Sequence, residues 1–137
     1  MLTYIYIAVG SAAGGVLRYI VGNVVQRQLD PWAPRSGGLP FPIGTLVVNV
    51  TGAFLLGVIL IVSARYGEGA RHLRLLLAVG LCGGYTTFSS FSGDTIGLLE
   101  NGGTGLAALN VVASVGLSLL ATFAGVMLAR GFYPRPL

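Results

Sequence analysis

Four long apolar stretches dominate the hydrophobic pattern of this chain. They cover residues 4–26, 43–64, 73–99 and 106–129, and the second and fourth contain no charged residue. A helix needs about 20 mostly apolar residues to cross the hydrocarbon core of a bilayer. Each stretch is long enough to do so. The pattern therefore predicts an all-α integral membrane protein, in which residues 1–137 form one domain of four transmembrane helices.

The third apolar stretch contains a polar segment. Residues 83–95 read GGYTTFSSFSGDT, and nine of these positions are Gly, Ser or Thr. Adjacent glycines followed by β-branched threonines make a poor helix interior, so we expect this helix to break at membrane depth. Unpaired peptide groups are costly in hydrocarbon, so such a break must be buried in protein or line a wet cavity or ion site. Close packing by small residues is the alternative interpretation.

Two further helices carry polar residues at helical spacing. Thr45, Asn49 and Gly52 share one face of the second predicted helix. The buried amide of Asn49 either makes an interhelical hydrogen bond or points its N–H groups at an anion. A polar stripe runs along the fourth helix, where it either packs closely or forms a track for a polar ligand. The stripe consists of Asn110, Ser114, Ser118 and Thr122.

Charge is scarce and all the basic residues are arginine. The 137 residues are 54% hydrophobic and 9% charged, whereas soluble domains carry about 25% charged residues. Most arginines flank the apolar stretches, which indicates membrane topology and headgroup contacts and not a nucleic-acid partner. Five lie on the side of the two termini and the second loop (Arg65, Arg71, Arg74, Arg130, Arg135), against Arg27 and Arg35 opposite, with Arg18 as a third if its side chain leans that way. This modest bias favours termini inside and permits a weakly biased dual orientation.

The apolar stretches contain no catalytic set. No nucleophile lies beside a base, no metal-ligand spacing occurs, and Cys82 and His72 are the single residues of their types. We therefore expect no enzymatic activity. The spans instead offer amide and hydroxyl donors, one acid at Asp94, and the ring edges of Phe88 and Phe91, which carry a partial positive charge. Four helices make a thin bundle, so polar faces are expected to meet between two subunits.

Arg18 lies inside the first apolar stretch, where a charge is expensive. Its side chain either reaches back to the membrane interface or faces a water-filled vestibule. No Asp or Glu accompanies it between residues 1 and 26. That absence argues against a small dual-topology multidrug transporter, which needs an intramembrane carboxylate in its first span. A structural subunit of a membrane complex is the other alternative, but it leaves the polar segment and the polar stripe unexplained.

Three motifs in order resemble the Fluc fluoride channels, also called the CrcB family. They are GGVLRY at residues 14–19, GTLVVNVTG at 44–52 and GLCGGYTTFSSFS at 80–92, and the resemblance covers nearly the whole chain. It implies an antiparallel, dual-topology homodimer in the plasma membrane, surrounded by lipid. It also implies two fluoride pores along the subunit interfaces and passive export of fluoride.

The resemblance assigns roles to individual residues. It implies a structural sodium ion at the dimer centre, held by the backbone carbonyls of Gly83 and Thr86. Arg18 becomes the vestibule arginine, and Asp94 becomes the acid that follows the helix break. Thr45 is a further polar intramembrane residue. The implied pore residues are Asn49, Thr87, Phe88, Phe91, Asn110, Ser114 and Ser118.

Overall fold

The computed structural model describes residues 1–29 and 40–132, and every regular element over these residues is a helix. Four segments are long and apolar enough to cross a membrane: α1, α2, the composite segment Arg71–Glu100, and α6. The predicted all-helical class with four candidate spans is confirmed. In chain order the elements are α1 (Leu2–Leu29), α2 (Ile43–Arg65), η2 (Gly67–Ala70), α3 (Arg71–Arg74), η3 (Leu75–Cys82), α4 (Gly83–Tyr85), α5 (Phe88–Glu100) and α6 (Thr104–Phe132).

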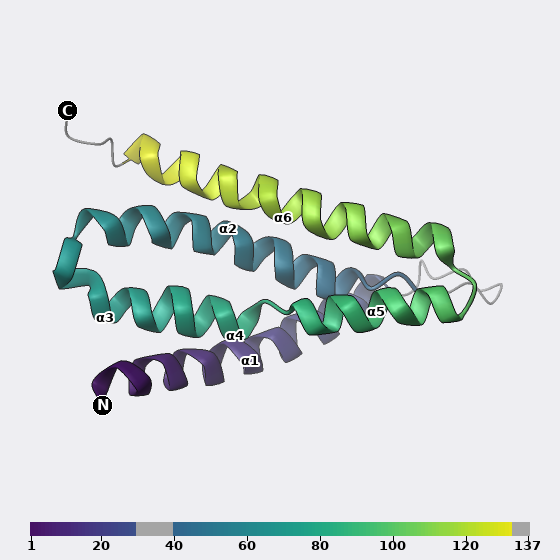
Figure 1. Cartoon of the computed structure of the whole chain (residues 1–137), viewed down its shortest axis with the longest axis horizontal. Helices are drawn as coiled ribbons and strands as arrows, with labels where there is room; N and C mark the ends of the chain where they lie inside the picture. Colours follow the sequence, from purple (N-terminus) through teal and green to yellow (C-terminus); the bar gives the residue numbers. More distant parts are fainter. Residues whose placement is uncertain (30–39, 133–137) are drawn as a thin grey trace.

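The helices run back and forth along one long axis (Figure 1). The start of α1, the end of α6 and α3 lie at one end of this bundle, and the turn between α5 and α6 lies at the other. Helix α1 continues to Leu29, three residues beyond the end of the first predicted span, 4–26. Residues 30–39, with Arg35, lie outside the described residues, as does Arg135.

The third candidate span is interrupted at Thr86 and Thr87. Both residues have extended backbones, with φ −74° and ψ 155° at Thr86 and φ −149° and ψ 113° at Thr87. The preceding glycines, by contrast, remain helical as the first two residues of α4. Gly84 lies directly against the backbone of Ser11 in α1, so its missing side chain serves close packing. The β-branched pair, not the glycine pair, therefore coincides with the interruption seen between α4 and α5 in Figure 1.

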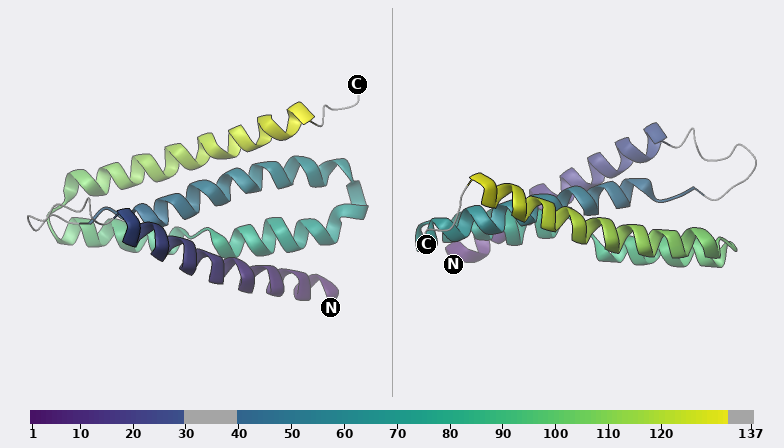
Figure 2. Two further views of the ribbon diagram at one scale, coloured as in Figure 1. Left: turned by 180° about the vertical axis from the view of Figure 1, so that it is seen from behind. Right: turned by 90° about the horizontal axis from the view of Figure 1, so that it is seen from above.

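Glycines bring the helices close together at two contacts, one between α2 and α6 and the other between α1 and the π-helix η3. Helix α2 packs mainly on α6, and α1 packs mainly on η3 and less on α2 and α4. A side chain at Gly57 or Gly125 would collide with the backbone of the facing helix across the α2–α6 contact. Gly10 and Gly14 meet the carbonyl groups of Leu76 and Leu81 in the same way. Figure 2 shows α1 crossing the other helices at an angle, which such small-residue contacts permit.

A glycine-dependent turn reverses the chain between α5 and α6. The N–H of Gly103 donates to the carbonyl of Leu98 at 2.8 Å, and the N–H of Gly102 donates to that of Leu99 at 3.0 Å. This is the Schellman pattern, which requires a left-handed residue at the position that Gly102 occupies with φ +80°. The turn lays α5 against the start of α6 and so aligns their polar residues.

Most large apolar side chains lie on the outside of the described chain. Valine, leucine, isoleucine and phenylalanine side chains are exposed along all four candidate spans, and few large side chains are fully buried. In water such a surface would drive aggregation. In a bilayer it faces lipid or another membrane-embedded subunit, as expected for a multi-pass protein of the cell membrane.

Two adjacent glycines of α1 provide a matched test of this packing. Gly14→Ala places a methyl group against backbone atoms of Leu81 and Tyr85, whereas Gly15→Ala meets no atom within 4 Å. Helix propensity favours both substitutions equally, so any difference reports packing. We expect Gly14→Ala to cost about 1–3 kcal/mol and lower the melting temperature of the purified protein, because backbone cannot move aside. Equal melting temperatures for the two variants would contradict this packing.

Candidate functional site

The side chain of Asn49 replaces a helical partner for the interrupted backbone. Its Oδ1 accepts a hydrogen bond from the N–H of Thr87 at 2.7 Å, and its Nδ2 donates to the carbonyl of Thr87 at 3.1 Å. One amide thereby satisfies both peptide groups of a residue that belongs to no helix. Asn49 thus bonds to a neighbouring segment of the chain, as in the first role considered from sequence, although its partner is the interrupted backbone and not a helix. Because Nδ2 carries two hydrogens, one donor is left over.

Thr87 also begins the next helix. Its Oγ1 accepts from the N–H of Ser90 at 3.1 Å, so Thr87 is the N-cap of α5. In an unbroken helix, the N–H of Thr87 would donate to Gly83 and that of Ser90 would donate to Thr86. Both donors are diverted, the first to Asn49 and the second to Thr87. The carbonyls of Gly83 and Thr86 therefore lose their ordinary helical donors.

The predicted shared face of α2 contacts the third span at three levels. Thr45 donates its hydroxyl hydrogen to Asp94 Oδ2 at 2.7 Å, and Asn49 binds Thr87. Gly52, one level further, faces Thr86 so closely that an added Cβ would overlap the threonine methyl group. The helical spacing of Thr45, Asn49 and Gly52 correctly predicted that they lie on one face.

A cavity of about 350 Å³ lies beside the interruption and joins α2, α5 and α6. It brings together residues from three motifs that are far apart in the sequence. Apolar side chains, among them Leu56 and Leu119, complete its wall. Of the residues singled out in the sequence, the cavity is lined by Asn49, Thr86, Thr87, Phe88, Phe91, Ser114 and Ser118.

The two phenylalanines contribute to this cavity in different ways. Their ring centroids are 5.3 Å apart and their planes are inclined by 52°. Phe91 is 9% exposed and is packed inside the protomer, whereas Phe88 is 77% exposed and projects from the surface of the single chain. The pair therefore reaches from the cavity wall to the outside of the protomer.

The polar stripe of α6 divides into two groups. Asn110 is 1% exposed and lines neither this cavity nor the larger one described below. Its Nδ2 donates to Thr95 Oγ1 at 2.9 Å, and its Oδ1 accepts from Ser114 at 3.3 Å, so it joins α6 to α5. Thr122 donates back to the carbonyl of Ser118 in its own helix. Only Ser114 and Ser118 of the stripe reach the cavity.

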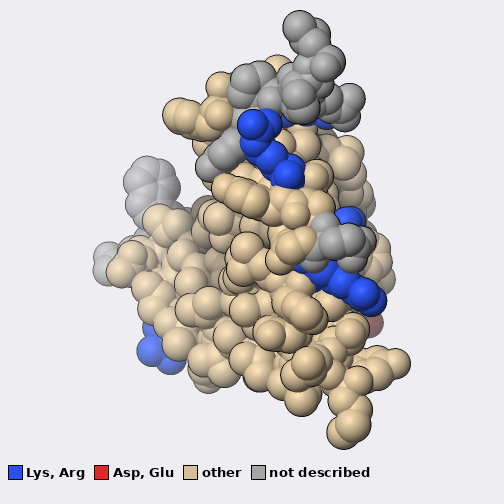
Figure 3. All heavy atoms as spheres, turned by 90° about the vertical axis from the view of Figure 1, so that its left-hand side faces the viewer, with Lys and Arg blue, Asp and Glu red and all other residues tan. Residues whose placement is uncertain are grey.

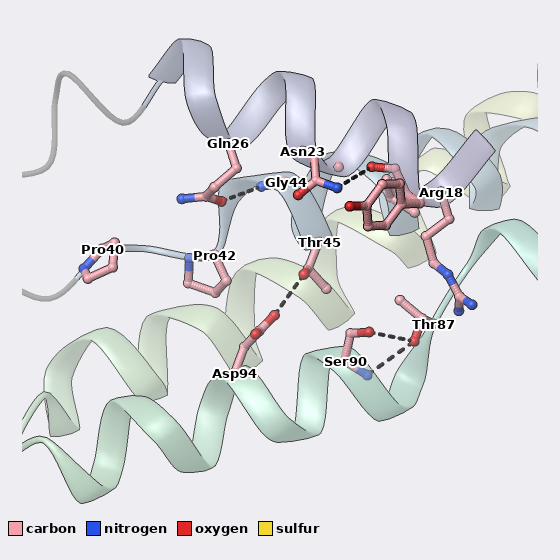
Figure 4. Close-up of a pocket in the computed structure, with 13 residues that line it drawn as sticks. Arg18, Asn23, Gln26, Pro40, Pro42, Gly44, Thr45, Thr87, Ser90 and Asp94 are labelled. Atoms are coloured by element: carbon pink, nitrogen blue, oxygen red, sulfur yellow. Dashed lines mark hydrogen bonds between the residues drawn. The ribbon is translucent and has the colours of Figure 1, made fainter. Parts of the chain in front are cut away.

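A second cavity, of about 490 Å³, lies between α1, α2 and α5 (Figure 4). Thr87 lines both cavities, so it stands between them. In Figure 4, Arg18 extends toward Thr87, while Asp94 is turned to Thr45. Within residues 1–29 and 40–132, the guanidinium of Arg18 makes no hydrogen bond or ion pair, although it is only partly exposed. A positive charge without a partner therefore faces this cavity.

Gln26 is a site residue that the sequence reasoning did not single out. Its Oε1 accepts from the N–H of Gly44 at 3.0 Å, and its Nε2 donates to the carbonyl of Phe41 at 3.2 Å. The start of α2 has no side-chain cap of its own, because Pro42 occupies that position. Gln26 thus joins the end of α1 to the beginning of α2 beside the larger cavity. Only its polar character at the end of an apolar stretch pointed to this role.

Ser90 and Thr95 were also missed as individual residues. Ser90 lies three positions after Thr87, which is the spacing of a helix N-cap and its partner. This spacing could have located the start of α5. Thr95 gave no such signal, since its bond to Asn110 depends on how α5 and α6 pack.

Taken together, the helices and cavities define a multi-pass membrane protein with two cavities beside an interrupted helix. Residues 5–126 match the family described as CrcB-like protein, Camphor Resistance (CrcB). The chain belongs to this family. The match covers all four candidate spans almost completely.

Relatives over nearly the full length carry the same printed name, "Fluoride-specific ion channel FluC". The protein of Agrobacterium fabrum is 41% identical over 133 residues, which cover 97% of this chain and 100% of the relative. The protein of Rhizobium etli is 45% identical and that of Geobacter sulfurreducens 46% identical, each over 95% of this chain and 98% of the relative. These relatives are named as ion channels and not as enzymes.

The bridge made by Gln26 can be tested on one backbone amide. Gln26→Met removes both side-chain bonds at similar length, so the N–H of Gly44 loses its acceptor. A lost bond of about 1 kcal/mol corresponds to roughly fivefold faster hydrogen exchange at Gly44. Asn23→Met is the matched control, because Asn23 lines the same cavity but donates back to Tyr19 in α1. Unchanged exchange at Gly44 in Gln26→Met would contradict the bridge.

Proposed function

We propose that this protein is a fluoride-selective channel that lets fluoride leave the cell passively. The observation that carries the proposal is the convergence of Asn49, the phenylalanine pair and two serines on one cavity. The names of relatives at 41–46% identity support fluoride as the ion. The relatives come from bacteria, for which passive exit of fluoride through the cell membrane would relieve fluoride accumulation.

The larger cavity is the entrance in this proposal. Fluoride is small and strongly hydrated, so a route through the membrane must replace its water shell with donors that are already in place. The unpartnered guanidinium of Arg18 attracts the anion into the cavity. The Thr45 hydroxyl donates a hydrogen bond to the carboxylate of Asp94 and holds it toward α2. Asp94 therefore makes no ion pair with Arg18.

The smaller cavity then provides a graded set of donors. Asn49 offers its second Nδ2 hydrogen, and Ser118 offers a hydroxyl that makes no side-chain hydrogen bond within the described residues. Ser114 points its hydrogen at Asn110 and must rotate before it can serve an anion. The edges of Phe88 and Phe91 bind an anion only weakly, which lets it move on. Strong and weak donors in sequence favour both entry and exit.

The functional unit in this proposal is an antiparallel, dual-topology homodimer with two pores. The strong exposure of Phe88 supports it, because half of the aromatic pair is left without cover in a single chain. Gly83 is also on the surface, where a side chain would meet no atom of the same chain. A second copy would cover this face and complete the wall of the smaller cavity.

A sodium ion at the dimer centre fits the residues that would hold it. The carbonyls of Gly83 and Thr86 lose their helical donors at the interruption, because the N–H groups of Thr87 and Ser90 are bonded elsewhere. Oxygen atoms of unwound backbone are typical sodium ligands in membrane proteins. Two such carbonyls from each subunit would coordinate the ion, which would replace the missing hydrogen-bond donors of both interrupted helices. The ion would stabilise the dimer and would not be transported.

Fluoride efflux from liposomes that contain only the purified protein tests the proposal. We expect rapid fluoride release and little chloride release with sodium present. Phe88→Ile and Phe91→Ile should each slow fluoride release by about three- to tenfold, because an aliphatic side chain lacks the positive ring edge.

Phe123→Ile is the matched control for the phenylalanine variants. Phe123 lies on α6, is 63% exposed and lines neither cavity. Its substitution should leave the fluoride rate unchanged. If a correctly folded dimer released no fluoride, the proposed channel function would be refuted. Equal fluoride rates for all three variants would contradict a role of Phe88 and Phe91 in conduction.

Sodium dependence is a separate prediction. Replacing sodium with N-methylglucamine, which is too large for backbone carbonyls, should convert dimer to monomer in detergent, as measured by light scattering. Readdition of sodium should restore the dimer, because four carbonyls without donors are costly in an apolar interface. A dimer that persists with unchanged flux after complete sodium removal would rule out the site.

A further inference from the structure

One end of the bundle carries most of the described arginines. The end of α2 contributes Arg65, α3 contributes Arg71 and Arg74, and the end of α6 contributes Arg130. All four side chains are exposed. Figure 1 places these three elements at the same end, and Figure 3 shows the arginines spread over that face. We call these four residues the basic end.

The opposite end is balanced in charge over the described residues. Arg27 lies in the last turn of α1 there and is exposed, and Glu100 ends α5 there and is exposed as well. At the basic end the sequence places one acid, Glu68, among four arginines. Among the described residues, positive charge is therefore in excess at the basic end and not at the opposite end.

We propose that the basic end binds the phosphodiester groups of anionic phospholipids. A guanidinium presents paired N–H donors that match two phosphate oxygens. Phosphatidylcholine offers the same phosphate but adds a positive choline, so a cluster of arginines favours anionic lipids. Because the arginines come from three elements and do not converge on one cavity, they suit several neighbouring headgroups better than one soluble anion.

The depth of the basic end supports lipid as the source of phosphate. Tyr66 lies directly after α2 at the same end, and its side chain is exposed. Tyrosine settles at the level of the headgroups, because its ring is apolar and its hydroxyl is polar. Its position supports arginines at the height of lipid phosphate.

Helix α3 packs against η3, α2 and η2, and a ring contact also joins it to α1. The ring centroids of Tyr6 and His72 are 4.8 Å apart, and the ring planes are inclined by 33°. His72 lies between Arg71 and Arg74, so these contacts support the element that carries half of the cluster.

Native mass spectrometry of the purified protein tests the proposal. The protein is mixed with equal amounts of phosphatidylglycerol and phosphatidylcholine of the same acyl chains, and retained lipids are counted. Wild type should retain phosphatidylglycerol preferentially. In the combined variant Arg71→Gln, Arg74→Gln and Arg130→Gln, the ratio of retained phosphatidylglycerol to phosphatidylcholine should fall about fivefold for each arginine replaced. Arg27→Gln should leave this ratio unchanged.

A lysine variant and the dependence on salt serve as controls for this experiment. Lysine at the same three positions retains the charge and should retain most of the preference for phosphatidylglycerol. If the glutamine variant does not fold, wild type still tests the idea, because its preference must weaken as salt rises. A preference that salt does not change, or that Arg27→Gln lowers equally, would overturn the proposal. Full competition by glycerol phosphate would assign the arginines to a soluble anion and overturn it too.

Discussion

The two hydrogen bonds between Asn49 and the backbone of Thr87 are the constraint on which the site depends. A peptide group that leaves a helix in hydrocarbon must find another partner, and here one side chain serves both its N–H and its carbonyl. With that partner in place, Thr87 caps α5, and the carbonyls of Gly83 and Thr86 are released. The interruption, the helix start and the free carbonyls thus have a common cause on α2.

Close helix contacts determine where that constraint acts. Glycines at the α1–η3 and α2–α6 contacts allow backbones to approach without intervening side chains. The resulting bundle is thin, so few large side chains are buried and much apolar surface remains outside. Such a chain depends on its surroundings for cover, through lipid on most faces and through a second copy near Phe88 in the proposed dimer.

Polar groups around the two cavities fall into two populations. Buried side-chain oxygen and nitrogen atoms of the described residues all have hydrogen-bond partners, including Asn110 in its contact with Thr95. Unused donors on Arg18, Asn49 and Ser118 face the two cavities. Satisfied groups hold the helices together, whereas groups with unused hydrogens are available to an ion. The position of a polar residue on the stripe of α6 did not separate these roles, because neighbouring positions serve both.

The sequence by itself determined the class of the protein and most of the candidate cavity. Long uncharged stretches have no stable place in water, so they predict membrane spans, and helical spacing alone put Thr45, Asn49 and Gly52 on one face. Tertiary structure decided which polar residues face a cavity and which fasten helices. It placed Asn110 behind Ser114, kept the glycine pair helical and used Gln26 to join α1 to α2. These outcomes depend on which groups of another helix lie opposite, and periodicity along one helix carries no information about that neighbour.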